Sequence, residues 1–297
     1  MELFNSDLER NITFVRPPYF IISGFTGIPN MKYYYVILFI VYIVSVLGNT
    51  AVMVIICLDH TLRTPNYVAV FNLAFADLFG SSAVVPKLPF NAPFNLVALS
   101  YDRLIAIIFP LHYQVKVTHK FMFSLIAVSW LFVITVTLIS VDLLTRLSYC
   151  ESVVINSYFC DYDFIQDLAC NDNALNVVTD HLISVLTLWL PLLFILCCYS
   201  HIGYTVLAAV RERVKAFKTC TSHLSLVAIY FLPVMFTFAL NEYIDANTRL
   251  INMCLTTVFP PMLNPIIYVL QTQEIQVSVK RLLKIKKQSK TPVKCKI

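Results

Sequence analysis

Long stretches without charge dominate the pattern of hydrophobic and polar positions along the chain. Five runs contain no Asp, Glu, Lys or Arg, and a sixth contains only Asp77. A helix that crosses the hydrocarbon core of a bilayer needs about 20 mostly apolar residues. The runs are apolar on all sides, which is typical of lipid-embedded helices rather than amphipathic surface helices. They cover residues 33–58, 66–86, 121–141, 181–210, 219–241 and 250–270.

A seventh apolar segment, at residues 88–101, is shorter than the others. Pro89 and Pro93 are expected to prevent a regular helix before Phe94. The residues from Phe94 to Tyr101 would then reach only about 12 Å, at about 1.5 Å per residue. That is less than half of a hydrocarbon core of about 30 Å. We expect residues 87–93 to enter the membrane and complete the crossing.

The positions of the basic residues decide whether this short segment crosses. Lys and Arg gather in cytoplasmic loops. If the segment crosses, most of the 22 Lys and Arg residues lie on the inner side, including those of the 211–218 loop and of the C-terminal tail. If it does not cross, both clusters move outside. The charge pattern therefore predicts an all-α membrane protein, a seven-transmembrane helix bundle with a truncated third helix.

This topology predicts three regions. Residues 1–30 form an extracellular N-terminal tail, 31–271 the seven-helix transmembrane domain, and 272–297 a cytoplasmic amphipathic helix and basic tail. Asn11 begins the sequon Asn-Ile-Thr in the outer tail, where glycosylation is expected. Ile275, Val279 and Leu282 share one face of the tail helix, with lysines around them. This helix is expected to lie on the anionic lipids of the inner leaflet, and not to bind nucleic acid.

Composition narrows the function classes. Hydrophobic residues make up 58% of the chain and charged residues 13%, whereas soluble domains carry about 25% charged residues. A soluble enzyme is therefore excluded. No phosphate loop or HExxH, GxSxG or CxxC motif is present, so we expect no enzymatic activity, no cofactor and no catalytic metal. A transporter would need several intramembrane charges, and only Asp77 lies deep in a run.

Asp77 is the main candidate for a functional polar group within the membrane. A carboxylate at mid-span is costly and usually functional. It could bind a cation, titrate, or hydrogen-bond a neighbouring helix as a purely structural clamp. Asn49 and Asn264 are polar candidates in two other runs. Asp102-Arg103 ends the short segment, either as an interfacial pair that closes a helix or as a charge pair that works as a switch.

Three cysteines, Cys150, Cys160 and Cys170, lie in the long outer loop between the fourth and fifth runs. An oxidising exterior predicts disulfides there. Because three is an odd number, one outer thiol lacks a partner within the loop. The loop contains no histidine to complete a zinc site.

Several motifs resemble those of odorant receptors, within the rhodopsin-like G-protein-coupled receptors. The resemblance extends from about residue 25 to residue 283, and its sixth- and seventh-helix motifs are the most specific. The outer loop is also similar to theirs, since its second cysteine lies in the motif YFCD and its third in the motif LAC. The motifs are GN at residues 48–49, LRTPNY at 62–67, LSYDRLIAI at 99–107, PLHY at 110–113, KAFKTCTSHL at 215–224 and PPMLNPIIY at 260–268.

The resemblance implies a function and residue roles. An odorant would bind among the outer halves of the third, fifth, sixth and seventh helices, with Tyr230 and Phe231 in the pocket. Binding would favour a state that opens the inner face to a stimulatory, olfactory-type heterotrimeric G protein at the plasma membrane. Asn49, Asp77 and Asn264 would form the polar network that often holds sodium. The switch and coupling roles fall to Asp102, Arg103, Tyr199, Lys215, His223 and Tyr268.

The chain departs from the family pattern in one large way. The family places about twice as many residues between the positions of Asp77 and Asp102 as this chain has. The missing stretch carries the first outer loop, the outer half of the third helix and a disulfide cysteine. By family pattern Cys150 pairs with Cys170, and Cys160 is left without its partner. Leu104 also replaces the tyrosine that usually follows Asp-Arg.

This departure leaves a second interpretation open. The chain could be a non-functional receptor or a mis-joined gene product that lacks part of its ligand pocket. The loss of a native disulfide costs about 2–5 kcal/mol. The amino-acid sequences of the outer loop and the first inner loop resemble those of fish-type receptors, which implies water-soluble odorants. A membrane transporter is the third hypothesis.

Overall fold

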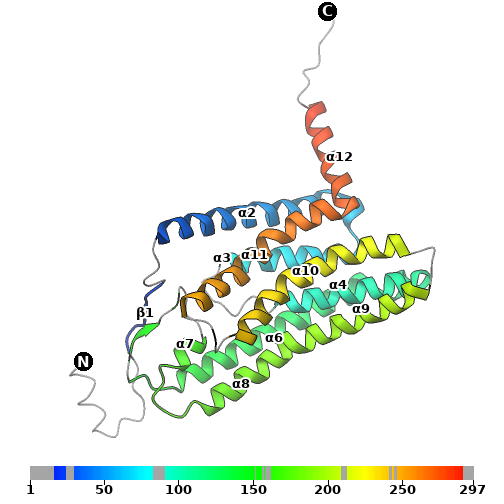
Figure 1. Cartoon of the computed structure of the whole chain (residues 1–297). Helices are drawn as coiled ribbons and strands as arrows, with labels where there is room; N and C mark the ends of the chain where they lie inside the picture. Colours follow the sequence, from blue (N-terminus) through cyan, green and yellow to red (C-terminus); the bar gives the residue numbers. More distant parts are fainter. Residues whose placement is uncertain are drawn as a thin grey trace, which may run out of the picture.

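The apolar runs of the sequence form long helices that pack side by side (Figure 1). In this computed structural model the described residues are 17–24, 30–82, 91–150, 152–155, 157, 162–208, 213–240, 243 and 246–289. Within them, the chain forms a seven-helix bundle with a small pair of strands at one end and a separate C-terminal helix at the other. The predicted fold class is confirmed.

Three helical stretches are long and apolar enough to cross a membrane by themselves. They are α2 (Met31–Leu58), α6 (His119–Thr145) and the continuous stretch Ala174–Val206. The last consists of α8 (Ala174–Ser184), a π-helical turn η4 (Val185–Trp189) and α9 (Leu190–Ala208). The Thr118 side chain caps α6 by accepting a hydrogen bond from the Phe121 N–H at 3.2 Å.

Three further helices, α3 (Pro65–Ser82), α10 (Arg213–Leu240) and α11 (Ala246–Gln271), pack among these. Shorter apolar stretches lie within two of them, at His223–Thr237 of α10 and Cys254–Leu270 of α11. Polar side chains interrupt the hydropathy of α3 and α11, and these side chains provide the hydrogen bonds between helices described below.

The truncated third helix is α4 (Asn91–Ile108). The prediction that helix begins only at Phe94 is wrong, because Pro93 occupies the first turn, where its missing N–H would have no helical partner. The helix also continues through Asp102 to Ile108. Its 18 residues therefore span about 27 Å, at about 1.5 Å per residue, which is well over the predicted reach. The segment after it, η3 (Pro110–His112) and α5 (Tyr113–Lys116), is bent by 116° from α4. Residues 83–90, which include most of the expected membrane-entering stretch, lie outside the described residues.

The N-terminal segment and the long loop after α6 meet at one end of the bundle, called the outer end here because the sequence predicts it to be extracellular. Strand β1 (Ile21–Ile22) pairs in parallel with β2 (Val154–Ile155), in the register Ile21 to Val154. A disulfide joins Cys150 and Cys170, as the family resemblance implied. The short helix α7 (Tyr162–Gln166) lies between them in sequence. Cys160 and Asn11 fall outside the described residues.

The inner end carries a short 3-10 turn, η1 (His60–Leu62), and the helix α12 (Gln273–Ser289). Figure 1 shows α12 leaving the end of α11 at a steep angle to the bundle. The predicted tail helix is therefore present, and its contact with lipid stays a prediction.

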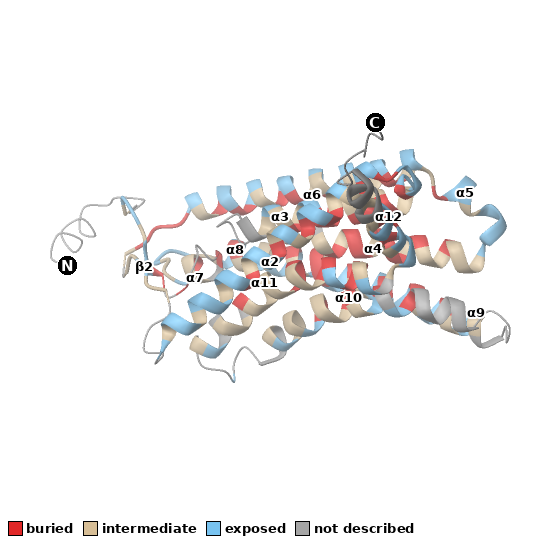
Figure 2. Ribbon diagram, turned by 90° about the horizontal axis from the view of Figure 1, so that it is seen from above, coloured by how far each residue is buried: buried red, intermediate tan, exposed pale blue. Residues whose placement is uncertain are grey.

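Burial follows the pattern expected of a lipid-embedded bundle. Figure 2 shows buried residues where the helices face one another and exposed residues on their outer sides. Leu73, Leu99 and Met122 are buried in one apolar core, whereas Phe39 of α2 and Leu138 of α6 are exposed. Large apolar side chains on the outside of the bundle are stable in hydrocarbon.

A close approach of α2 and α11 gives a test of this packing. A Cβ atom added to Gly48 would lie 3.0 Å from Cβ of Pro265, whereas one added to Gly203 of α9 would meet nothing within 4 Å. We expect Gly48→Ala to destabilise the purified protein by about 1–3 kcal/mol through overpacking. Gly203→Ala should leave its melting temperature unchanged or raise it, because alanine favours helix. Equal melting temperatures for the two variants would contradict the close contact.

Candidate functional site

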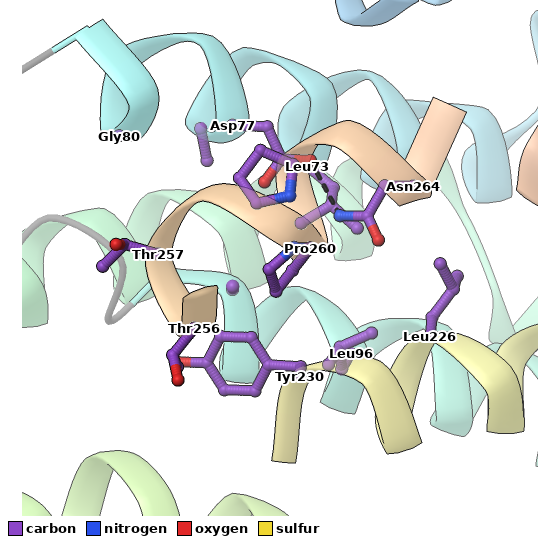
Figure 3. Close-up of a pocket in the computed structure, with 13 residues that line it drawn as sticks. Leu73, Asp77, Gly80, Leu96, Leu226, Tyr230, Thr256, Thr257, Pro260 and Asn264 are labelled. Atoms are coloured by element: carbon purple, nitrogen blue, oxygen red, sulfur yellow. Dashed lines mark hydrogen bonds between the residues drawn. The ribbon is translucent and has the colours of Figure 1, made fainter. Parts of the chain in front are cut away.

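A mostly apolar cavity with a few polar side chains lies within the bundle, between α3, α4, α10 and α11 (Figure 3). The cavity volume that is open to water-sized molecules is about 40 Å³. The first two turns of α4 contribute Ala92 and Leu96 to its wall. The cavity therefore lies level with the outer end of the shortened helix. Its polar lining comes from Asp77, Tyr230, Thr256, Thr257 and Asn264.

A hydrogen bond across the cavity joins two of the predicted network residues. The Asn264 side-chain amide of α11 donates to Oδ2 of Asp77 in α3 at 2.8 Å, and both side chains are buried. Asn49 of α2 does not share this bond. Its amide donates to the backbone carbonyls of Pro261 at 2.7 Å and Ser45 at 3.0 Å. The predicted set thus ties α2 and α3 separately to the same stretch of α11.

Side chains with oxygen atoms line part of the cavity. Asp77 has a carboxylate, and Asn264, Thr256 and Thr257 have neutral oxygens, the ligand type that hard cations prefer. The two threonine hydroxyls donate to backbone carbonyls of their own helix, those of Asn252 and Cys254. The described residues contain no group of three or more His, Cys, Asp or Glu side chains that could hold a transition metal.

The two predicted pocket residues lie in different places. Tyr230 lines the cavity, and Figure 3 shows it extending from α10 toward Thr256. Phe231 is buried in the apolar core and is not part of the cavity wall. The two rings meet edge to face with centroids 5.1 Å apart. A ligand in the cavity would therefore touch Tyr230 directly and Phe231 only through it.

The pair Asp102-Arg103 lies in the last two turns of α4. Asp102 is 1% exposed and accepts a hydrogen bond from the Tyr113 hydroxyl at 2.6 Å. Arg103 Nε lies 3.8 Å from Oδ2 of Asp102. Tyr113 belongs to the inner loop segment α5, and burial beside Asp102 raises the pKa of its phenol. The carboxylate is thus held by both its own helix and the loop that follows.

Three further predicted switch residues lie on other helices. The Tyr199 hydroxyl of α9 lies 2.5 Å from Nδ1 of His223 in α10, and the two rings are stacked. Tyr268 of α11 is buried in the apolar core against which Tyr199 packs. Both α9 and α10 pack against α4, the helix of Arg103. Lys215 lies in the first turn of α10, and its side chain is outside the described part of the chain.

A second buried polar cluster was not predicted from the sequence. The Asn72 amide of α3 donates to Oδ1 of Asn95 in α4 at 2.6 Å, and Nε1 of Trp130 in α6 donates to Oδ1 of Asn72 at 2.9 Å. Asn72 and Asn95 stand in apolar runs, as Asp77 does. Polar residues that stand alone in apolar runs are the sequence feature that could have indicated this cluster. The cluster joins the shortened α4 to α3, and α3 to α6.

A larger apolar cavity of about 290 Å³ lies at the outer end, under the N-terminal segment. Phe20, Leu144 and Tyr149 are among its lining residues. The Tyr149 hydroxyl donates to the Leu144 carbonyl at 3.0 Å, so it bonds within the protein. This cavity is apolar and separate from the Asp77 cavity.

The two tryptophans of the chain provide a matched test of the Asn72 cluster. Trp130→Phe removes the donor to Asn72, and we expect a loss of stability of about 0.5–1.5 kcal/mol. Trp189 is 47% exposed on the outer side of the bundle, so Trp189→Phe should have almost no effect. Thermal unfolding of the purified variants in lipid nanodiscs would measure both. Similar losses in the two variants would show that the hydrogen bond does not stabilise the bundle.

Comparisons with known proteins identify relatives across most of the chain. The family model described as "Olfactory receptor" matches residues 88–286. The rat protein "Olfactory receptor 1" is 33% identical over 92% of this chain and 96% of its own length. The human protein "Olfactory receptor 1J1" is 32% identical over 89% of this chain and 91% of its own length.

The fold is also similar to a solved structure. The crystal structure of squid rhodopsin superposes with a TM-score of 0.70, covers 92% of each chain and is 16% identical in sequence. This likeness shows a shared seven-helix fold. Together with the family match, it means that the chain is a multi-pass membrane protein of a receptor class. The chain belongs to the olfactory receptor family, within the rhodopsin-like G-protein-coupled receptors.

Proposed function

We propose that this chain is an odorant receptor of the plasma membrane, with its N-terminus outside and its C-terminus in the cytoplasm. It binds a small-molecule odorant and activates a stimulatory, olfactory-type heterotrimeric G protein. The family supports a small-molecule ligand and coupling to a G protein. The odorant response of this chain and the type of G protein go beyond what membership of the family supports.

The polar pair of Tyr199 and His223, on two helices that pack against the helix of Arg103, is the observation that carries this proposal. The Tyr199 hydroxyl lies 2.5 Å from Nδ1 of His223, and Asp102 lies beside Arg103. A buried, polar cluster that joins helices at one end of a bundle can adopt two discrete sets of partners. Such bistable contacts allow a small shift at a ligand site to become a larger movement of a helix.

Tyr268 is the member of the cluster with a hydrogen bond left to make. Its side chain is buried, and within the described part of the chain its hydroxyl has no hydrogen-bond partner. A buried hydroxyl without a partner carries a cost of about 1–3 kcal/mol. A conformation that gives the hydroxyl a partner recovers this energy. Ligand binding that favours such a conformation would then shift the population toward the signalling state.

The ligand site is proposed to include the Asp77 cavity. Tyr230 contributes an aromatic ring with a hydroxyl, Thr256 and Thr257 contribute hydroxyls, and Leu96 contributes an apolar surface. Small-molecule sites combine a mostly apolar lining with a few placed polar groups. Since the cavity lies level with the start of α4, it would replace pocket contacts that a longer third helix makes.

Asp77 and Asn264 are also proposed to hold a sodium ion. The proposal rests on the buried Asp77 carboxylate and on the neutral side-chain oxygens of Asn264, Thr256 and Thr257 in the same cavity lining. A bound ion that contacts both α3 and α11 would favour the conformation in which these helices are close.

The function is tested by expressing the chain with an N-terminal epitope tag and recording cAMP against a panel of odorants. For an odorant that gives a response, Tyr268→Phe should lower the maximal cAMP signal several-fold. It should not lower thermal stability, because no hydrogen bond is lost. Tyr204 is exposed on α9, so Tyr204→Phe should change neither quantity.

Two results would contradict this proposal. The first is a surface-expressed chain that raises no cAMP with any odorant of a broad panel. The second is a Tyr268→Phe variant that signals as the wild type does, which would remove Tyr268 from the switch.

The cation site has its own test. Sodium that binds the folded state raises its stability in proportion to the logarithm of concentration above the dissociation constant. The melting temperature of the purified receptor should therefore rise when NaCl replaces choline chloride at constant ionic strength. Asp77→Asn keeps an acceptor for the Asn264 amide but removes the charge, so the rise should disappear. A rise of the same size in the variant, or none in the wild type, would exclude the site.

The alternative is a non-functional or mis-joined chain. The observation that favours it is the 18-residue α4 beside the 28 residues of α2. Sequencing the olfactory transcript across the codons for Pro86 to Asp102 separates the cases. The family spacing between the positions of Asp77 and Asp102 is about twice the spacing in this chain. About 26 additional codons in the transcript would restore that spacing and would show a mis-joined chain. If the junction is confirmed, retention of the tagged chain inside the cell would show a non-functional receptor.

A further inference from the structure

Asp59 joins the first inner loop to a distant part of the chain. It follows α2 directly and caps the short turn η1, with its Oδ1 accepting hydrogen bonds from the Thr61 N–H at 2.9 Å and the Thr61 hydroxyl at 2.7 Å. It is 6% exposed. A carboxylate this well covered needs a cationic partner or several donors. The turn supplies two donors, and a second element supplies the charge.

That second element is α12. Nη1 of Arg281 lies 3.1 Å from Oδ1 and 3.0 Å from Oδ2 of Asp59. The Arg281 side chain is 48% exposed, so its guanidinium lies at the rim while the carboxylate lies inside. The neighbouring Ser278 hydroxyl, the Thr61 donors and Arg281 all favour the charged carboxylate and lower its pKa to about 2. Asp59 therefore stays ionised throughout the physiological range.

Arg281 lies on the side of α12 that faces the protein. Ile275 and Ser278 are each 1% exposed, and Ile275 belongs to the main apolar core. Residues spaced by three share one side of a helix, so Ile275, Ser278 and Arg281 form one continuous contact line. Val277 and Lys280 are exposed. The helix thus has a protein-facing side that is distinct from the side open to its surroundings.

We infer that the ion pair between Asp59 and Arg281 is a latch that fixes α12 against the first inner loop. The latch holds the helix by a contact within the protein, and the attraction of its lysines for anionic lipid is not required. Asp59 and Arg281 are then positioning residues for the inner face of the receptor. Because the latch also involves the cap of η1, a movement of α12 is transmitted to the loop and to the end of α2.

Hydrogen–deuterium exchange of α12 tests the latch. The full chain is placed in nanodiscs of pure phosphatidylcholine, which carry no net charge. Arg281→Gln removes the cation, and Asp59→Asn removes the anion but keeps a side-chain acceptor that caps the turn. Lys280→Gln is the matched control, since it removes the same charge from the adjacent, exposed position. Arg281→Lys keeps the charge and serves as the conservative variant.

The latch predicts faster exchange of the backbone amides of residues 273–282 in two variants. Arg281→Gln and Asp59→Asn should each raise it several-fold, the double variant should raise it no further, and Arg281→Lys should restore most of the protection. Lys280→Gln should match the wild type. Arg281 is half exposed and outside the bundle core, so its variants leave the fold intact even if Asp59→Asn does not.

Three results would overturn the latch. The first is unchanged exchange in Arg281→Gln. The second is an equal increase in Lys280→Gln, which would show that general charge on α12 holds it. The third is an unprotected α12 in the wild type in uncharged discs, protected only when anionic lipid is added. None of these measurements needs an odorant or a G protein, so the latch and the proposed function fail or stand separately.

Discussion

A polar side chain within a hydrocarbon-embedded bundle must find its partner on another helix, and this constraint organises the structure. No water is present in the bilayer core to satisfy an isolated amide or carboxylate. Asp77 therefore bonds to Asn264, Asn49 to the carbonyl of Pro261, and Asn72 to Asn95 and Trp130. Each of these bonds fixes one helix against another at a definite height.

The shortened third helix makes this constraint more severe. α4 has fewer residues with which to contact its neighbours, yet it lies against α3, α6, α9 and α10. Asn95 anchors its outer half to Asn72, and Asp102 anchors its inner end to Tyr113. Both anchors lie after the stretch in which the chain is shorter than the family pattern. The proposed coupling residues at the end of α4 therefore keep an anchor, while α4 contributes only its first turns to the wall of the proposed ligand site.

Sequence patterns predict some of this structure well, for physical reasons. Charge-free runs indicate the helices because charged side chains are unfavourable in hydrocarbon. Asp77 is recognisable as a candidate because a carboxylate within such a run is costly unless it has a partner. The start of α4 differs from the prediction because Pro93 lies in the first turn of the helix, which tolerates proline. The partners of Asn72 and Asp59 were missed because pairing depends on how helices far apart in sequence align. No local pattern records that Arg281 will reach a carboxylate that precedes it by 222 positions.

The proposed function requires that the short α4 crosses the membrane, so that the bundle has an odd number of crossings. Epitope tags at the two termini of the full chain test this directly. Antibodies applied to intact cells should label the N-terminal tag, and the C-terminal tag should be labelled only after permeabilisation. Labelling of both tags on the same side of the membrane would mean that α4 does not cross, and would contradict the topology on which the proposed function depends.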